Sequence, residues 1–389
     1  MPQPTRCPNR GCPHHHAPGA GWKIFFGSYL TIAHGRIRRY QCRICGTTMS
    51  DQTESLHYCA KRRVPLRALY SLLLAGASQR EIARRYGLSC VAVHNAVLRL
   101  GRQAMAAHLH LLAALPERPA VTFDGLRSCI TSQDYPCDIT TVVEPEGEMI
   151  LSLSHAIMRR GGRMTRAQRR RVRVKYRRWR PRAGSVQRSI SLIGSEIADY
   201  LRPPADAPAT IDTDEHPGYK HMLTRSPIYR HLRTAGQLIH RRTPSTAPRT
   251  TENRLFPVNY VDRLIRHRLR EHTRETIAIG RNAVMQMHRA WLFTWDHNAM
   301  REHRVKRPDE GVHAHWSGIS ETDLTAVKRQ FFQRRLRPPS PLIPETIRQV
   351  WLGELQTPPV RWRLGQRGTM VRIPGFAVRD LASPYQQDC

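Results

Sequence analysis

The chain has 389 residues, of which 40% are hydrophobic and 24% charged, a composition typical of a folded protein with two or three domains and not of a disordered one. Its 63 Lys and Arg residues against 30 Asp and Glu residues give a formal net charge of +33, which favours an anionic partner such as nucleic acid. The sequence has no apolar run near the length of a membrane-spanning helix and no signal peptide at its start, so we expect a cytoplasmic protein without a membrane partner.

Two cysteine pairs stand near the N-terminus, Cys7 with Cys12 and, thirty residues later, Cys42 with Cys45. Four thiolates give zinc a closed tetrahedral shell, and a segment this short and basic would depend on the metal for much of its stability. We therefore predict a zinc ribbon over residues 1–60 that holds one structural Zn²⁺. Two alternatives stay open: a histidine of the run 14–16 replaces one cysteine, although solvated loop histidines fit better, or the thiols are free in a β-hairpin.

Residues 61–116 carry helical signals. Leucines at helical spacing come first, then a capping-box pattern opens a helix at Ser78, and Ser89 caps another helix after a turn that contains Gly87. This order predicts a helix-turn-helix with residues 89–101 as recognition helix, followed by a helical connector over residues 104–116. The side chains expected to face DNA are Gln79, Arg80, His94 and Asn95. A helical hairpin used only for packing is the alternative.

The next segments predict strands and one helix. Residues 119–126 form a buried-strand pattern around Asp124, and a charge in such a strand is costly unless it is paired or bound to metal. Residues 139–143 and 149–153 predict a β-hairpin, and residues 185–201 an amphipathic helix. The run Ala209–Ile211 then ends in Asp212, Asp214 and a Pro-Gly breaker, a pattern that delivers carboxylates to a sheet edge, where they suit hard divalent cations. A further strand is possible at residues 228–232.

Residues 159–182 contain thirteen Arg or Lys and no acid. With no acid in the run to form helical ion pairs, contact with nucleic-acid phosphates is favoured over a solvated insertion. An aromatic side chain in the run could stack on bases. The residues predicted to contact DNA here are Arg169, Arg170, Arg171, Lys175 and Trp179.

The last informative stretch follows a polar loop over residues 241–256. A helix then begins, with Asn259 as N-cap and Asp262 in the first turn, where stabilisation of the helix dipole is the ordinary role of an acid. An apolar stripe in the next helix predicts core. Residues 321–335 predict a basic helix, and residues 301–389 as a whole give no functional cue.

The order of these parts resembles the bacterial insertion-sequence transposases of the DDE superfamily. The most specific segments are the Cys42–Cys45 knuckle, Asp214-Glu215-His216-Pro217 and residues 256–266. The resemblance implies an α/β fold: an RNase H-like mixed sheet flanked by helices over residues 117–300, with a basic insertion near residues 159–201, preceded by the zinc ribbon and the helix-turn-helix. Residues 301–389 would be a basic C-terminal extension.

The resemblance also implies a catalytic triad of acids, one on the first strand, one after the fourth and one on a later helix. Asp124, Asp214 and Asp262 occupy those places and would bind Mg²⁺ or Mn²⁺, as two ions. The third acid of the superfamily is usually Glu, so Glu252, Glu271 and Glu275 are the alternatives to Asp262. The alternative to Asp214 is Asp212.

The implied activity is cleavage and strand transfer of double-stranded DNA at the terminal repeats of the element, joined to target DNA. Such proteins act as dimers or larger assemblies on DNA, in the bacterial nucleoid. Two other functions compete with this one: a sequence-specific DNA-binding regulator, such as an inactive domesticated transposase, and a structure-selective nuclease that cuts without joining.

Overall fold

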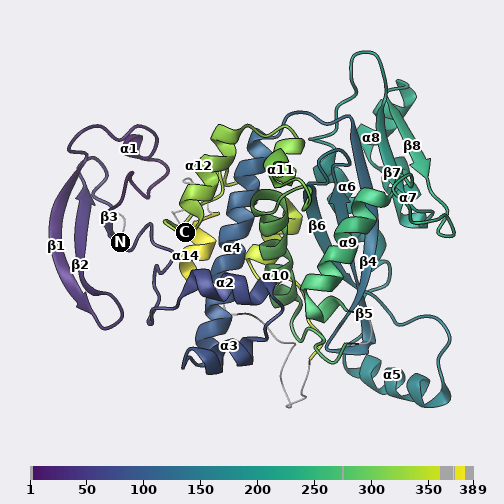
Figure 1. The fold of residues 1–389 in the computed structure, drawn as a ribbon. Helices are drawn as coiled ribbons and strands as arrows, with labels where there is room; N and C mark the ends of the chain where they lie inside the picture. Colours follow the sequence, from purple (N-terminus) through teal and green to yellow (C-terminus); the bar gives the residue numbers. More distant parts are fainter. Residues whose placement is uncertain (1–2, 274–275, 360–370, 372, 382–389) are drawn as a thin grey trace.

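The protein is described here from a computed structural model that covers residues 3–273, 276–359, 371 and 373–381. It is a mixed α/β structure with a small antiparallel sheet, a group of central helices and a five-stranded mixed sheet, in that order across the molecule (Figure 1). In the part of the chain so described, no helix is both long enough and apolar enough to cross a bilayer.

The small sheet is built from the N-terminal residues. Its strands are β1 (Lys23–Thr31), β2 (Gly35–Cys42) and β3 (Thr48–Ser50), paired antiparallel in the order β1-β2-β3. Its core cluster consists of Trp22, Tyr40 and Met49 beside cysteines, and Ile37 on β2 is buried as well. So small a core cannot hold three strands together without another source of stability.

The larger sheet has the strand order β6-β5-β4-β7-β8. β4, β5 and β6 are antiparallel neighbours, which confirms the predicted hairpin, whereas β7 and β8 run parallel to β4. The bounds of the strands are β4 (Ala120–Ile130), β5 (Ser132–Val143), β6 (Ile150–Ile157), β7 (Ala209–Thr213) and β8 (Leu238–Arg242).

The strand considered at residues 228–232 is wrong. Helix α8 (Pro227–Thr234) occupies that place, and the fifth strand, β8, comes only after it. Pro227 at the first helical position favours a helix, and the buried Tyr229 and half-buried Leu232 are three residues apart, the spacing of one helical face. The predicted helix at residues 185–201 is present as α6 (Ser185–Ile197).

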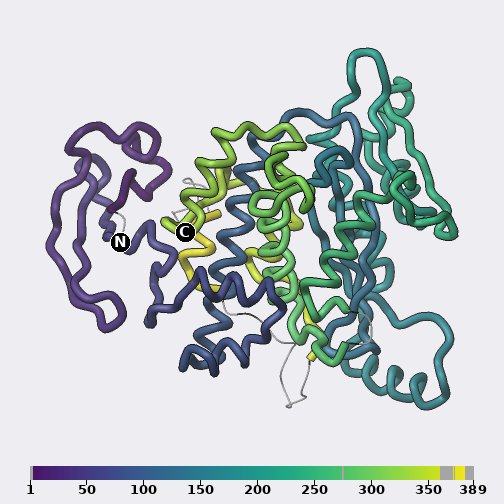
Figure 2. Tube along the Cα trace, viewed as in Figure 1, coloured from purple at the N-terminus to yellow at the C-terminus, as the bar shows by residue number. Residues whose placement is uncertain are grey.

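The central helices join the two ends of the chain. α4 (Cys90–Ala114) is continuous over 25 residues, so the connector expected at residues 104–116 is the second half of the helix expected at 89–101. α10 (Ala283–Trp295) and α12 (Glu321–Phe331) pack along it. Figure 2 follows the chain from the small sheet through α4 into the large sheet and back to α10 and α12.

The described residues after position 300 are therefore part of the fold and not an appended extension. The Gln103 amide on α4 donates to the carbonyls of Phe331 and Arg334 at 2.8 and 2.9 Å, and its oxygen accepts from the Leu336 amide at 2.9 Å. α13 (Glu345–Trp351) contacts α6, α10 and β6. The segment around α5 (Arg166–Arg178) projects from one end of the large sheet (Figure 1).

The other helices lie around these layers. They are α1 (Pro13–His16), α2 (Leu66–Leu74), α3 (Gln79–Arg85), α7 (Pro217–Arg225), α9 (Phe256–Arg268), α11 (His313–Trp316) and α14 (Gly375–Arg379), the 3-10 turns η1 (Arg270–His272) and η3 (Pro308–Glu310), and the π-helical turn η2 (Asp296–Met300).

Candidate functional site

Three predicted acids line one cleft of about 880 Å³ at an edge of the large sheet. Asp124 lies in the middle of β4, and Asp214 follows directly after the end of β7. β4 and β7 are parallel neighbours with Phe123 paired to Thr213. The residues that follow this pair, Asp124 and Asp214, therefore lie side by side. The sheet register therefore brings Asp124 and Asp214 together.

Asp262 reaches the same cleft from α9. Helix α9 begins at Phe256 with Leu255 as N-cap, so the prediction of an N-cap at Asn259 is wrong. Pro257, whose fixed backbone angle suits the first helical turn, is the signal that places the start earlier. Asp262 thus lies in the second turn, buried against the sheet, and accepts a hydrogen bond from Thr141 Oγ1 at 3.2 Å. Thr141 is paired with Asp124 across β4 and β5.

The carboxylates of this cleft repel one another. Burial and the charge of Asp124 raise the pKa of Asp262 well above its ordinary value. Burial and the charge of Asp214 likewise raise the pKa of Asp124, even though the Gly125 amide donates to it at 2.7 Å. Buried, converging acids whose pKa values are raised are a donor set that fits divalent cations with oxygen ligands.

Asp138 on β5 is a fourth acid of this site that the sequence analysis missed. It is buried, its Oδ1 lies 3.3 Å from Arg127 Nε, and burial raises its pKa despite that arginine. Gly125 on β4 makes room for it, because a Cβ at this position would lie 2.6 Å from Asp138 Oδ1. A signal was available: Asp138 directly precedes residues 139–143, which the sequence predicts to be a strand, and an acid is costly to bury there unless it is paired.

The segment after β7 orients the Asp214 carboxylate. Asp214 Oδ1 accepts from the His216 amide at 2.8 Å, and His216 Nδ1 accepts from the Gly218 amide at 3.1 Å, which caps α7. Glu215 points to solvent. Tyr219 on α7 is buried beside the acids, and burial together with their negative charges raises the pKa of its phenol well above the ordinary value. The carboxylates that raise it are Asp124, Asp138, Asp214 and Asp262.

The alternative acids have other surroundings. Asp212 is buried in an ion pair with Arg241 at 2.5 Å and does not line the cleft. Glu271 lines the cleft but pairs with Arg289 at 2.9 Å. It lies in η1, beyond the end of α9, so the expectation that it shares a helix with Asp262 is wrong. Glu252 is exposed and accepts from Thr251 Oγ1 at 2.7 Å. Glu275 lies outside the described residues.

The raised pKa of Asp262 predicts a stability change. In the absence of divalent metal, D262N should raise the free energy of unfolding at pH 7 by about 1 kcal/mol, because it removes a buried negative charge but keeps an acceptor for Thr141. A carboxyl group whose pKa is higher in the folded state than in the unfolded state destabilises the folded state at high pH. This destabilisation disappears as the pH falls towards about 4, the pKa of the unfolded state. Denaturant unfolding from pH 4 to 8 should show the gain shrinking with acid. The exposed Asp206 is the control, D206N, and a D262N variant less stable at every pH would contradict the argument.

Arginines surround the acidic floor of the cleft. Arg127, Arg249, Arg263 and Arg266 all line it. Cationic groups at the rim and acids at the floor would attract a phosphate backbone and hold a metal beneath it.

The basic helix α5 is docked by an acid that lies outside the basic run. Asp134 on β5 is buried and contacts Arg160 at 2.5 Å, Arg171 at 2.8 Å and Lys175 at 2.7 Å. Burial opposes ionisation of Asp134, but these cations outweigh it and lower the pKa of its carboxyl below the ordinary range. Arg171 and Lys175, predicted to contact DNA, thus have a partner within the protein.

Trp179 also has an intramolecular role. Its ring lies edge-on to Tyr135 with centroids 5.5 Å apart, and its carbonyl accepts from the Tyr135 hydroxyl at 3.2 Å. Arg169 and Arg170 are exposed. The outward face of α5 therefore carries the remaining predicted DNA contacts.

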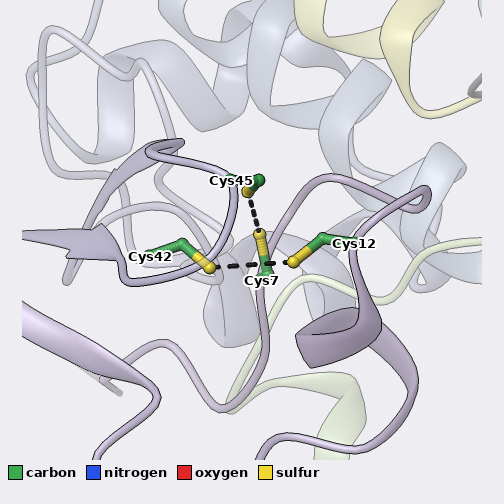
Figure 3. Close-up of side chains that lie close together, drawn as sticks. All are labelled: Cys7, Cys12, Cys42 and Cys45. Atoms are coloured by element: carbon green, nitrogen blue, oxygen red, sulfur yellow. Dashed lines mark hydrogen bonds between the residues drawn. The ribbon is translucent and has the colours of Figure 1, made fainter.

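The four N-terminal cysteines converge in space (Figure 3). Cys7 Sγ lies 3.4 Å from Cys45 Sγ, and Cys12 Sγ lies 3.7 Å from Cys42 Sγ. Sulfurs at the corners of a zinc tetrahedron with bonds of about 2.3 Å are roughly 3.8 Å apart, whereas a disulfide brings them to about 2.05 Å. The cluster could therefore hold a zinc ion. At Cys45 burial favours the neutral thiol, but hydrogen bonds with Thr47 outweigh it and lower the pKa to about 6.

The neighbouring histidines are not ligands in this cluster. His15 is buried, contrary to the expectation of solvated loop histidines, and its Nδ1 lies 2.7 Å from the Cys7 carbonyl oxygen. That contact fixes the loop that presents Cys7.

The two helices predicted for a helix-turn-helix correspond to α3 and α4, which are joined by a turn over residues 86–89. Ser78 and Ser89 cap the two helices by accepting from the Glu81 and Ala92 amides. Among the predicted DNA contacts, Arg80 and Asn95 are exposed and Gln79 is half-buried. His94 is half-buried and lies two turns before Gly101, whose backbone abuts His288 of α10, so His94 is on the packing face of α4.

Comparison with known proteins gives no family: no family model matches the chain, and no curated protein matches it significantly.

Proposed function

We propose that this protein is a transposase of a bacterial insertion sequence, which cuts and joins DNA strands with Asp124, Asp214 and Asp262 as metal-binding acids. The observation that carries the proposal is the convergence of these residues, 138 positions apart at the extremes, in one arginine-rimmed cleft. Their places also fit an RNase H-like domain: one on the first strand of the large sheet, one after the fourth, and one on a later helix.

The side chains of the cleft would have different roles. Asp124, Asp214 and Asp262 would hold Mg²⁺ or Mn²⁺, which when bound activates an attacking water or 3′-hydroxyl and stabilises the leaving oxygen. Thr141 and the His216 amide keep two of these carboxylates oriented. Asp138 holds Arg127 at the rim, where its guanidinium can contact a phosphate.

The other parts of the chain would bind DNA. In this proposal the small sheet and its four cysteines form a zinc ribbon, and α3 with α4 contacts the terminal repeats through exposed side chains such as Arg80 and Asn95. The outward face of α5 adds phosphate contacts beside the catalytic sheet. A net charge of +33 supports all three contacts, and a dimer on paired DNA ends is part of the proposal.

The direct test uses purified full-length protein, Mg²⁺ or Mn²⁺, and a DNA fragment with the sequences that flank the gene. We expect metal-dependent cleavage at the element ends and joining to a second DNA. Cleavage without joining would replace the proposal with a structure-selective nuclease. Specific binding without cleavage would replace it with a DNA-binding regulator.

The α5 contribution can be measured separately. R169A/R170A should reduce the magnitude of the slope of log K for DNA binding against log salt concentration by about two, because each lost phosphate contact removes about one released counterion. R329A/R379A removes the same charge from exposed positions on α12 and α14 and should leave the slope unchanged. Equal slopes for both pairs of substitutions would remove α5 from the DNA interface.

A further inference from the structure

A second group of metal-ligand side chains lies apart from the acidic cleft and from the four cysteines. Glu148, His303 and His313 each offer one ligand atom within 4.8 Å of the others. Their side chains are 4%, 3% and 2% exposed, and none of them lines the cleft. A buried cluster of two imidazoles and a carboxylate requires a physical explanation, because burying either kind of group without a partner costs free energy.

The cluster rests on a turn that the fold holds firmly. Glu148 closes the turn between β5 and β6, where Glu144 accepts from the Gly147 amide and from Ser317 Oγ, both at 2.7 Å. A Cβ at Gly147 would lie 2.2 Å from Ser317 Oγ, so the turn and the segment after α11 touch through backbone. Glu148 itself has φ of 55°, an uncommon conformation for a non-glycine residue, with its carboxylate buried.

His303 is the member of the cluster whose ring nitrogens lack hydrogen-bond partners. Neither of its ring nitrogens has a hydrogen-bond partner within the described chain. Its Nε2 is 3.7 Å from Glu148 Oε2, too far for a hydrogen bond. The rings of His313 and Trp316 flank it, with centroids 5.0 and 4.8 Å away. An imidazole lone pair in this position is available to a metal.

The surrounding groups orient the other two ligands. His313 Nδ1 lies 3.9 Å from Glu148 Oε2 and 2.8 Å from the Gly147 carbonyl oxygen, to which it can donate, the outer hydrogen bond that metal-bound histidines usually make. A donating Nδ1 leaves the lone pair of the ring on Nε2. Arg304 Nη1 donates to Glu148 Oε2 at 3.0 Å. The second carboxylate oxygen can ligate while this contact persists. Arg304 is half-exposed at the rim, where its movement would admit an ion.

We propose that Glu148, His303 and His313 bind one divalent transition-metal ion of the Zn²⁺ type, with a water at the open position. Two imidazole nitrogens and one carboxylate suit Zn²⁺ and similar ions, whereas Mg²⁺ and Ca²⁺ prefer oxygen ligands alone. The ion would tie the β5–β6 turn to residues 301–316 and so fix the returning chain to the large sheet. This site is independent of the proposed DNA chemistry.

Metal stoichiometry tests the proposal. Every protein in this test and the next carries D124N/D214N, so that the acidic cleft does not add to the count. Full-length D124N/D214N protein, purified without chelators and dialysed against Zn²⁺, should contain two equivalents by mass spectrometry, one at the cysteines and one here. H303N and E148Q should each contain one equivalent, and C12S/C45S should also retain one. H267N replaces an exposed histidine elsewhere and should retain two.

Co²⁺ titration keeps the test valid if H303N does not fold. In the D124N/D214N protein, one equivalent should produce thiolate-to-metal absorption, and a second should bind with d–d bands but no thiolate absorption. D124N/D214N protein that binds a single equivalent with thiolate absorption would overturn the proposal. Two equivalents retained by folded H303N would overturn it as well.

Discussion

D124N and D214N should each reduce metal-dependent DNA cleavage and joining by roughly 10³-fold or more, while binding to the flanking repeats is retained. The reason is geometric. Each carboxylate is one of only a few protein ligands that divalent ions would have in the cleft, and both come from rigid, neighbouring parallel strands. The measurement is strand joining on flanking-sequence DNA, with a gel-shift assay for binding on the same preparations.

Two further variants identify which acids matter. D206N changes an exposed acid and should leave joining unchanged. D212N breaks the buried pair with Arg241, so it should lower the melting temperature and yet retain joining at temperatures where the protein is folded. If D212N lost joining while folded and D214N retained it, the assignment of the second acid would pass to Asp212.

The acids of the site were predictable where local pattern and strand topology agree. Asp124 stands out as a charge in a buried strand, and Asp214 as a charge at a strand end, and both lie in the cleft. Asp138 follows the same logic as Asp124 and was missed because the apolar run that predicted the strand begins at Ile139, whereas β5 begins at Ser132 and has Asp138 near its middle. Its closeness to Gly125 depends on strand register, which the sequence does not show directly.

Other features depend on partners that are distant in the sequence. The basic run at residues 159–182 contains no acid, but Asp134 lies 26 residues before Arg160 and reaches it through the pairing of β5 with its neighbours. The role of residues 301–389 was likewise hidden, because Gln103 recognises backbone carbonyls more than 200 residues away, and backbone carbonyls carry no sequence signal. Local pattern predicted α4 in two pieces, although the helix is continuous, because its middle is buried on all sides and shows no helical periodicity.

C12S or C45S should unfold the small sheet while the large sheet stays folded. Structural zinc supplies about 10–16 kcal/mol of apparent binding free energy in zinc-finger peptides, far more than the few buried side chains of this sheet can provide. Contacts from residues 3–54 to the helices include polar and partly exposed ones, such as Glu54 with Arg334 at 3.5 Å, whereas Leu56 already belongs to the main core, so loss of the small sheet need not melt the rest.

Limited proteolysis checks this separation. Cleavage within residues 1–60 should become fast in both variants, while a fragment that begins near residue 61 persists. A chelator should produce the same pattern in the wild-type protein. C90S replaces an exposed cysteine outside the cluster and should behave as wild type. If C12S and C45S resisted proteolysis as well as C90S does, packing and not metal would hold the small sheet, and the distances between sulfurs of 3.4 and 3.7 Å would reflect buried thiols alone.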